Sequence, residues 1–88
     1  MKRYITLILR IDPTLYPELF TENYSDYCGL WYDIDILGDT FSSYENQGST
    51  GPVSYVVMGG VHEDRLVQTM HKCLELFHGD AQTMEVMF

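Results

Sequence analysis

Three groups of residues in this 88-residue sequence have types and spacing that could support chemistry. The first group is His71, Glu75 and His78, whose i, i+4, i+7 spacing could bring two imidazoles and a carboxylate to one side of a helix as metal ligands. A helical wheel places the histidines at the border of the apolar stripe and Glu75 away from it. That pattern is typical of a solvated helix flank, so we predict neither a metal site nor a cofactor.

The second group surrounds a glycine pair, Gly59-Gly60, which precedes His62, Glu63 and Asp64. Glycines before a helix N-terminus can cradle a phosphate. Here the two acids occupy the positions that an anion would need, and the longer G-x-G-x-x-G motif is absent. We therefore expect the glycines only to turn the chain from a strand into a helix.

The third group is a pair of aspartates, Asp33 and Asp35, in the segment Leu30–Asp39. Residues two apart on a strand place their side chains about 6.6 Å apart on one face, which is too far to share one ion unaided. Exposed, solvated carboxylates are also not expected to serve as general acids. The two cysteines, Cys28 and Cys73, have neither a redox nor a zinc spacing and no base nearby in the pattern. We predict no catalytic residues and expect that the protein is not an enzyme.

The distribution of charge is the least ordinary feature of the chain. The formal net charge is −8, and no lysine or arginine occurs between Ile11 and Asp64. Such a surface repels nucleic acid and anionic membranes and attracts basic partners. The same stretch contains Trp31 and all the tyrosines except Tyr4, and these residue types are enriched at protein interfaces. Solubility alone is the simpler explanation of the charge, and this alternative stays open.

Hydrophobic periodicity predicts the elements that position these residues. Alternation with period two predicts strands over 3–11, 30–37, 53–60 and 83–88, with residues 40–45 prolonging the second strand beyond a bend at Gly38. Helical spacing predicts helices over 17–27 and 61–79, and the cluster at 46–52 predicts a hairpin tip. The order favours a single α+β domain over residues 1–88, with a ferredoxin-like β-α-β-β-α-β fold: a four-stranded antiparallel sheet with two helices on one face.

The apolar runs of the sequence are short. None approaches the roughly 20 residues that span a bilayer. The N-terminal run is interrupted by Arg10 and Asp12, and no small-residue cleavage site follows. We expect a cytoplasmic protein that does not contact membranes.

The strand over 30–37 is expected to turn Trp31, Asp33 and Asp35 away from the core and Ile34 and Ile36 toward it. An aromatic anchor beside charged groups is the anatomy of a protein interface. Six residues of this acidic region form the predicted partner-binding site: Trp31, Asp33, Asp35, Asp39, Tyr44 and Glu45.

These features predict a small acidic binding protein that blocks a basic surface of a nucleic-acid-handling partner, as antitoxins, nuclease immunity proteins and phage anti-defence inhibitors such as anti-CRISPR proteins do. It is not expected to bind nucleic acid directly. Full duplex mimicry over a width of about 30 Å would need about eighteen charges on one face. The chain has thirteen acids in all, so only a partial DNA mimic is expected. The alternative is a ferredoxin-like regulatory module that forms a homodimer through its open sheet face and binds a small metabolite.

Overall fold

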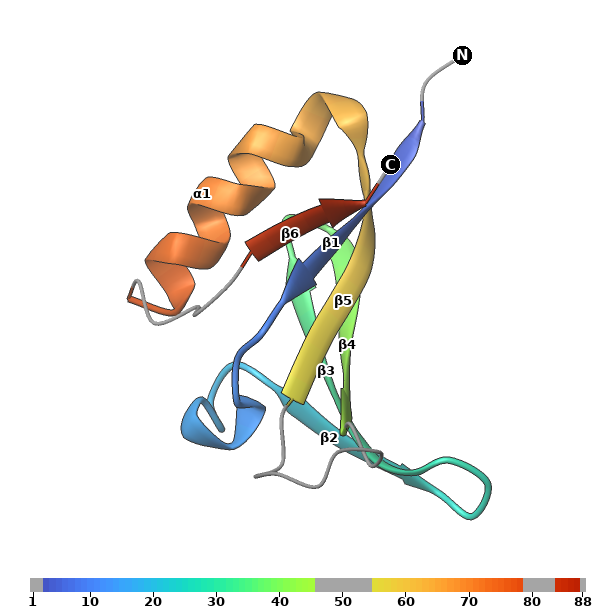
Figure 1. Cartoon of the computed structure of the whole chain (residues 1–88). Coiled ribbons are helices and arrows are strands. Elements are labelled where there is room, and N and C mark those ends of the chain that lie inside the picture. Colours follow the sequence, from blue (N-terminus) through green and yellow to red (C-terminus); the bar gives the residue numbers. More distant parts are fainter. Residues whose placement is uncertain (1–2, 46–54, 79–83, 88) are drawn as a thin grey trace.

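The computed structural model describes residues 3–45, 55–78 and 84–87, which form an antiparallel sheet with one α-helix packed on one side (Figure 1). The sheet has six strands in the order β2-β3-β4-β5-β1-β6. Short 3-10 helices span Pro13–Leu15 and Glu63–Arg65, and the second leads directly into α1, Leu66–Leu76. The strands are β1 Tyr4–Leu9, β2 Thr21–Ser25, β3 Gly29–Ile36, β4 Asp39–Glu45, β5 Tyr55–His62 and β6 Met84–Met87.

The predicted ferredoxin-like fold is therefore wrong, and the first error lies in the predicted helix over 17–27. Residues Thr21–Ser25 instead form β2, an edge strand that pairs with β3. Tyr24 and Tyr27, which would belong to the apolar stripe of such a helix, are 71% and 100% exposed. Gly29 has φ +74°, and such a residue suits a helix end and a hairpin equally well, so it could not discriminate between them.

The second error lies at Gly38, where the chain reverses instead of continuing in one arm. Ile36 pairs with Asp39, and the two residues between them, Leu37 and Gly38, have φ +51° and +89°. Two positive φ angles at the centre of a two-residue loop characterise a type I′ hairpin. Asp35 Oδ1 accepts a hydrogen bond from the Gly38 amide at 2.9 Å. This hairpin and the β2–β3 hairpin give the sheet two more strands than predicted.

The remaining predicted elements are present. The strand expected over 3–11 is β1, and its inward residues Ile5, Leu7 and Leu9 are buried. The strand expected over 53–60 contributes β5, the one over 83–88 contributes β6, and the helix expected over 61–79 contains α1. The predicted hairpin tip at 46–52 lies outside the described residues, although β4 and β5 on either side of it pair antiparallel.

Gly59 and Gly60 lie inside β5, so the prediction that they turn the chain into a helix is wrong. The strand continues to His62, where the 3-10 helix begins. A Cβ on Gly59 would lie 2.7 Å from Cδ1 of Phe41, which is closer than real Cβ contacts. Gly59 is thus required because the Phe41 ring of the neighbouring strand fills the space above it.

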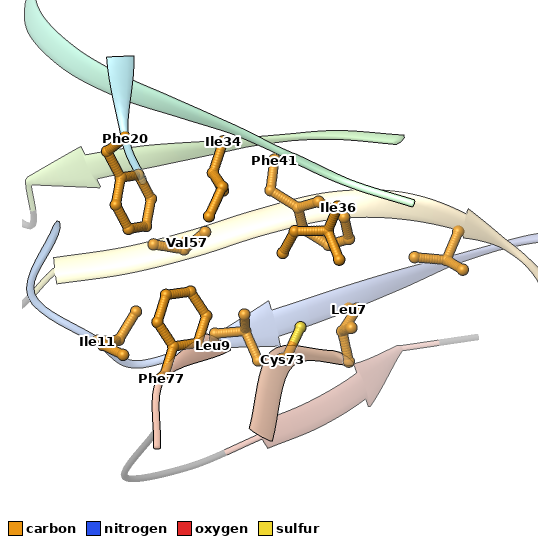
Figure 2. Close-up of a cluster of buried hydrophobic side chains, with 11 residues drawn as sticks. Leu7, Leu9, Ile11, Phe20, Ile34, Ile36, Phe41, Val57, Cys73 and Phe77 are labelled. Carbon is orange, nitrogen blue, oxygen red and sulfur yellow. The ribbon is translucent and has the colours of Figure 1, made fainter. Parts of the chain in front are cut away.

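The hydrophobic core lies between the sheet and a cover formed by α1 and the segment that follows β1 (Figure 2). Cys73 and Phe77 enter the core from the helix side, and Phe20 enters it from the segment after β1. The rings of Phe20 and Phe77 stack with their centroids 6.0 Å apart. The Tyr16 hydroxyl donates to the Phe77 carbonyl at 3.1 Å, which ties the two parts of the cover together. Within the described part of the chain, no helix combines the length and apolarity needed to cross a bilayer.

Candidate binding surface

The sheet face turned away from the core is called the open face here, and the strand register determines its members. Antiparallel partners share a face, so Asp33 lies with Thr21 and Ser42, and Trp31 lies with Asn23. The register then continues across the other strands. The described members of the open face are Thr21, Asn23, Trp31, Asp33, Asp35, Thr40, Ser42, Val56, Met58, Gly60, His62, Tyr4, Thr6, Ile8, Glu85 and Met87.

The structure brings Trp31, Asp33 and Asp35 together on this face, as the alternation of β3 predicts. Ile34 and Ile36, between and beyond them, point the other way and are buried. Trp31 and Asp33 are half-buried, whereas Asp35 is exposed. The positions of these three residues on the strand are therefore confirmed, while their role in binding stays a prediction.

Asp33 is the centre of a hydrogen-bond network that links three strands. Its Oδ2 accepts from Asn23 Nδ2 at 2.7 Å and from the indole Nε1 of Trp31 at 3.3 Å. Its Oδ1 accepts from Ser42 Oγ at 2.5 Å. These donors come from β2, β3 and β4. Asp33 thus holds the Trp31 side chain in place and contributes to the fold as well as to the charge of the surface.

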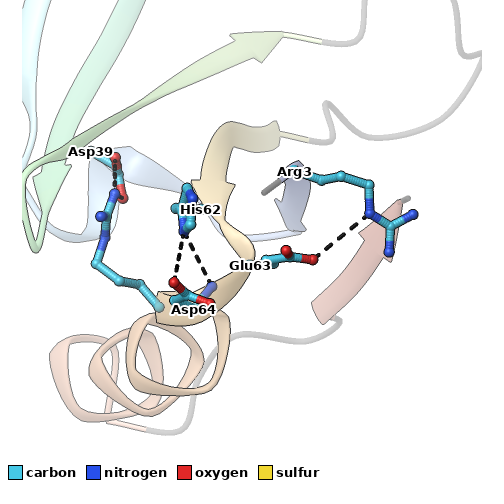
Figure 3. Close-up of polar contacts among 6 residues, drawn as sticks. Arg3, Asp39, His62, Glu63 and Asp64 are labelled. Carbon is cyan, nitrogen blue, oxygen red and sulfur yellow. Dashed lines mark hydrogen bonds and ion pairs between the residues drawn. The ribbon is translucent and has the colours of Figure 1, made fainter. Parts of the chain in front are cut away.

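Asp39 does not join this group. In the strand register it is the partner of Ile36, on the core side of the sheet. Its carboxylate accepts two hydrogen bonds from Arg65 Nη2, both at 3.0 Å (Figure 3). Only 14% of the Asp39 side chain is exposed. The ion pair joins the start of β4 to the end of the 3-10 helix and involves residues 26 positions apart, so local sequence patterns contain no signal of it.

The last two predicted binding residues, Tyr44 and Glu45, belong to β4. Their backbones pair with Val56 and Tyr55 of β5. Their side chains lie outside what the structure describes. Their predicted role therefore stays a prediction without structural support.

The histidines take structural or solvent-exposed positions. The His62 side chain caps the start of the 3-10 helix, because its Nδ1 accepts from the Asp64 amide at 3.3 Å (Figure 3). The same nitrogen lies 3.6 Å from the Asp64 carboxylate. His71 and His78 are exposed, and Glu75 pairs with Lys72 at 3.4 Å. Among residues 3–45, 55–78 and 84–87, no three His, Cys, Asp or Glu side chains are grouped as metal ligands.

The acids at the start of the helix also have partners within the protein. Glu63 Oε2 lies 3.7 Å from Arg3 Nε, and the Glu63 amide donates to the Arg3 carbonyl at 3.0 Å (Figure 3). An anion at this helix end would meet two carboxylates and an amide that is already bonded. The polar groups at this helix end are thus engaged by contacts within the protein and do not form an anion site.

The two cysteines differ in environment. Cys73 is fully buried among apolar side chains, and this burial raises the pKa of its thiol to about 11. At neutral pH it is therefore protonated and unsuited to nucleophilic attack. Cys28 is free and exposed in the loop that joins β2 to β3.

A pocket that the sequence pattern does not predict lies at the base of the β2–β3 hairpin, on the side opposite the open face. It has a volume of about 300 Å³ and is lined by Pro13, Thr14, Pro17, Phe20, Glu22 and Tyr32. These residues come from the first 3-10 helix, the turn after it, and the paired strands β2 and β3. The misassigned helix over 17–27 concealed the pocket, because Glu22 and Tyr32 become neighbours only when β2 pairs with β3.

Comparisons with protein-family models, curated proteins and solved structures find no match for this chain. The metabolite-binding alternative was based on the apolar half of the open face and on a glycine turn at Gly59-Gly60, within a ferredoxin-like fold. The fold and the turn are not present, and metabolite binding itself stays a prediction.

Proposed function

We propose that this protein is a small, non-enzymatic, acidic binding protein that blocks a basic surface of a nucleic-acid-handling partner. The observation that supports the proposal best is the open face over β2, β3 and β4. It presents the Trp31 ring beside the carboxylates of Asp33 and Asp35, and these three strands contain no lysine or arginine. An aromatic side chain surrounded by carboxylates, with no lysine or arginine on the same strands, suits a basic partner.

The network around Asp33 favours binding by organising the surface in advance. Asp33 accepts the Trp31 indole N–H at 3.3 Å, so part of the conformational freedom of this ring is already lost in the free protein. Ordering a large side chain only on binding would weaken the affinity. Asp35 uses one oxygen to accept from the Gly38 amide and is otherwise exposed to a partner.

The net charge of −8 supports the class of partner more broadly. Proteins that handle nucleic acid bind its phosphates through lysine and arginine, and an acidic protein competes for those groups. The thirteen acids are too few for a full duplex surface, so the proposed action is to cover part of the basic site.

The proposal is tested by capture of partners with the full tagged chain, identification by mass spectrometry, and binding measurements on the purified partner. Trp31→Ala is expected to weaken binding by about 2 kcal/mol, which is roughly a 30-fold higher Kd. Asp35→Lys should also weaken it, by placing like charge against a basic surface. Glu75→Lys is the matched control, since it makes the same charge change on the exposed side of α1.

Two further readouts complete the test. The captured partner should lose nucleic-acid binding when this protein is added, and the association rate should fall as the Debye length shrinks from about 10 Å at 0.1 M salt to about 3 Å at 1 M. The proposal is refuted if the partner retains its nucleic acid, or if Glu75→Lys weakens binding as much as Asp35→Lys does.

A further inference from the structure

The pocket beneath the β2–β3 hairpin has walls of two kinds. One wall is the cross-strand pair of Glu22 on β2 and Tyr32 on β3, which are direct partners in the register. The other wall is formed by Pro13, Thr14 and Pro17. Phe20 also lines the pocket, and its ring stacks on Phe77 with the centroids 6.0 Å apart. The pocket therefore combines two aromatic rings, two prolines and one carboxylate.

The charge that lines the pocket is negative. Among the described residues that line it, Glu22 is the only charged one, and none is a lysine or an arginine. Thr14 is held by Asp12, whose Oδ1 accepts from the Thr14 amide at 2.9 Å and from its hydroxyl at 2.6 Å. A cation entering the pocket would meet the Glu22 carboxylate and aromatic rings.

These features select among side chains that a partner could insert. An acidic side chain would be repelled by the Glu22 carboxylate, and an apolar one would gain nothing from its charge. A planar guanidinium can lie against aromatic rings and pair with a carboxylate at the same time. We infer that this pocket binds the guanidinium group of an arginine side chain presented by a basic peptide or protein.

The hairpin extends the same surface beyond the pocket. Tyr24 and Leu30 are the next cross-strand pair on the side of Glu22 and Tyr32, and both are exposed. They provide an apolar strip on which residues adjacent to the arginine can lie. The inference does not depend on the open face, since Trp31, Asp33 and Asp35 lie on the other side of the hairpin.

The inference is tested by NMR titration of the ¹⁵N-labelled full chain with acetyl-Gly-Arg-Gly-amide. The matched probe is the same peptide with citrulline, which has nearly the shape of arginine but no charge. Peptide is added to about 10 mM, because a single side chain is expected to bind in the millimolar range. The amide signals of Phe20, Glu22 and Tyr32 should shift, and the arginine peptide should bind at least about fivefold more tightly than the citrulline peptide.

Two conservative variants locate the site. Glu22→Gln removes the pocket charge from an exposed position and should weaken arginine binding by about two- to fivefold. Asp35→Asn removes one charge from the opposite face of the same hairpin, keeps an oxygen for the Gly38 amide, and should leave binding unchanged. The spectra of both variants also show directly that the fold is kept.

Three results overturn the inference: equal binding of the two peptides, no effect of Glu22→Gln, or the absence of shifts at the pocket. Shifts at Trp31 that Asp35→Asn abolishes would assign arginine binding to the open face, which contradicts the pocket while agreeing with the proposed function. Conversely, arginine binding that only Glu22→Gln weakens supports the pocket even if Trp31→Ala leaves partner binding intact.

Discussion

At the scale of single residues, Asp33 shows how one side chain can serve both the fold and a surface. Its carboxylate accepts hydrogen bonds from Asn23, Trp31 and Ser42, which lie on three adjacent strands. The sequence alone predicts only that this acid is exposed. Asp33→Ala should lower the free energy of unfolding by roughly 1–3 kcal/mol, since three partly buried donors lose their acceptor.

Asp35→Ala is the control for this prediction, because Asp35 is exposed and accepts only the Gly38 amide among the bonds described. It should cost less than about 1 kcal/mol. Urea denaturation measures both, and the midpoints should differ while the slope stays the same. Equal midpoints for the two variants would show that the Asp33 network contributes nothing to stability.

At the scale of elements, the β3–β4 hairpin contains a residue poorly suited to its position. Leu37 adopts φ +51° in the two-residue turn, where asparagine is favoured. Its side chain is substantially exposed, so little packing is lost on replacement. Leu37→Asn should therefore stabilise the protein by about 1 kcal/mol. Thermal unfolding checks this as a rise in Tm of roughly 4–8 °C.

The neighbouring position provides the opposite case. Gly38 has φ +89°, so Gly38→Ala should lower the Tm although nothing lies within 4 Å of the added Cβ. A lower Tm for Leu37→Asn would mean that the contacts of the leucine side chain outweigh its unfavourable backbone conformation.

At the scale of the whole molecule, the chain has thirteen aspartates and glutamates but only five lysines and arginines. Like charges repel more strongly in the compact state than in the unfolded chain, so the net charge of −8 should destabilise the fold at low salt. Raising NaCl from about 0.02 M to about 0.3 M at pH 7 should stabilise the protein by on the order of 1 kcal/mol, or roughly 4–8 °C in Tm. Near the pI of about 4.5 the net charge vanishes, and the salt effect should largely disappear. An equal rise at both pH values would rule out self-repulsion as its cause.

The sequence by itself determined the features that depend on near neighbours. Alternation along β3 assigns Ile34 and Ile36 to the core and Trp31 and Asp35 to the other face, because successive side chains on a strand point to opposite sides. Apolar spacing also predicts the helix that contains Cys73, and the charge distribution follows directly from composition.

Only the tertiary structure decided the features that depend on distant neighbours. Thr21–Ser25 is a strand because β3 supplies its hydrogen-bond partners, and a five-residue segment has too little periodicity of its own to choose between strand and helix. The Asp39–Arg65 ion pair, the glycine required beneath Phe41, and the pairing of Glu22 with Tyr32 all join residues at least ten positions apart. Strand pairing creates these contacts, and local spacing does not encode it. For this reason the acidic face could be anticipated, whereas the pocket on its other side could not.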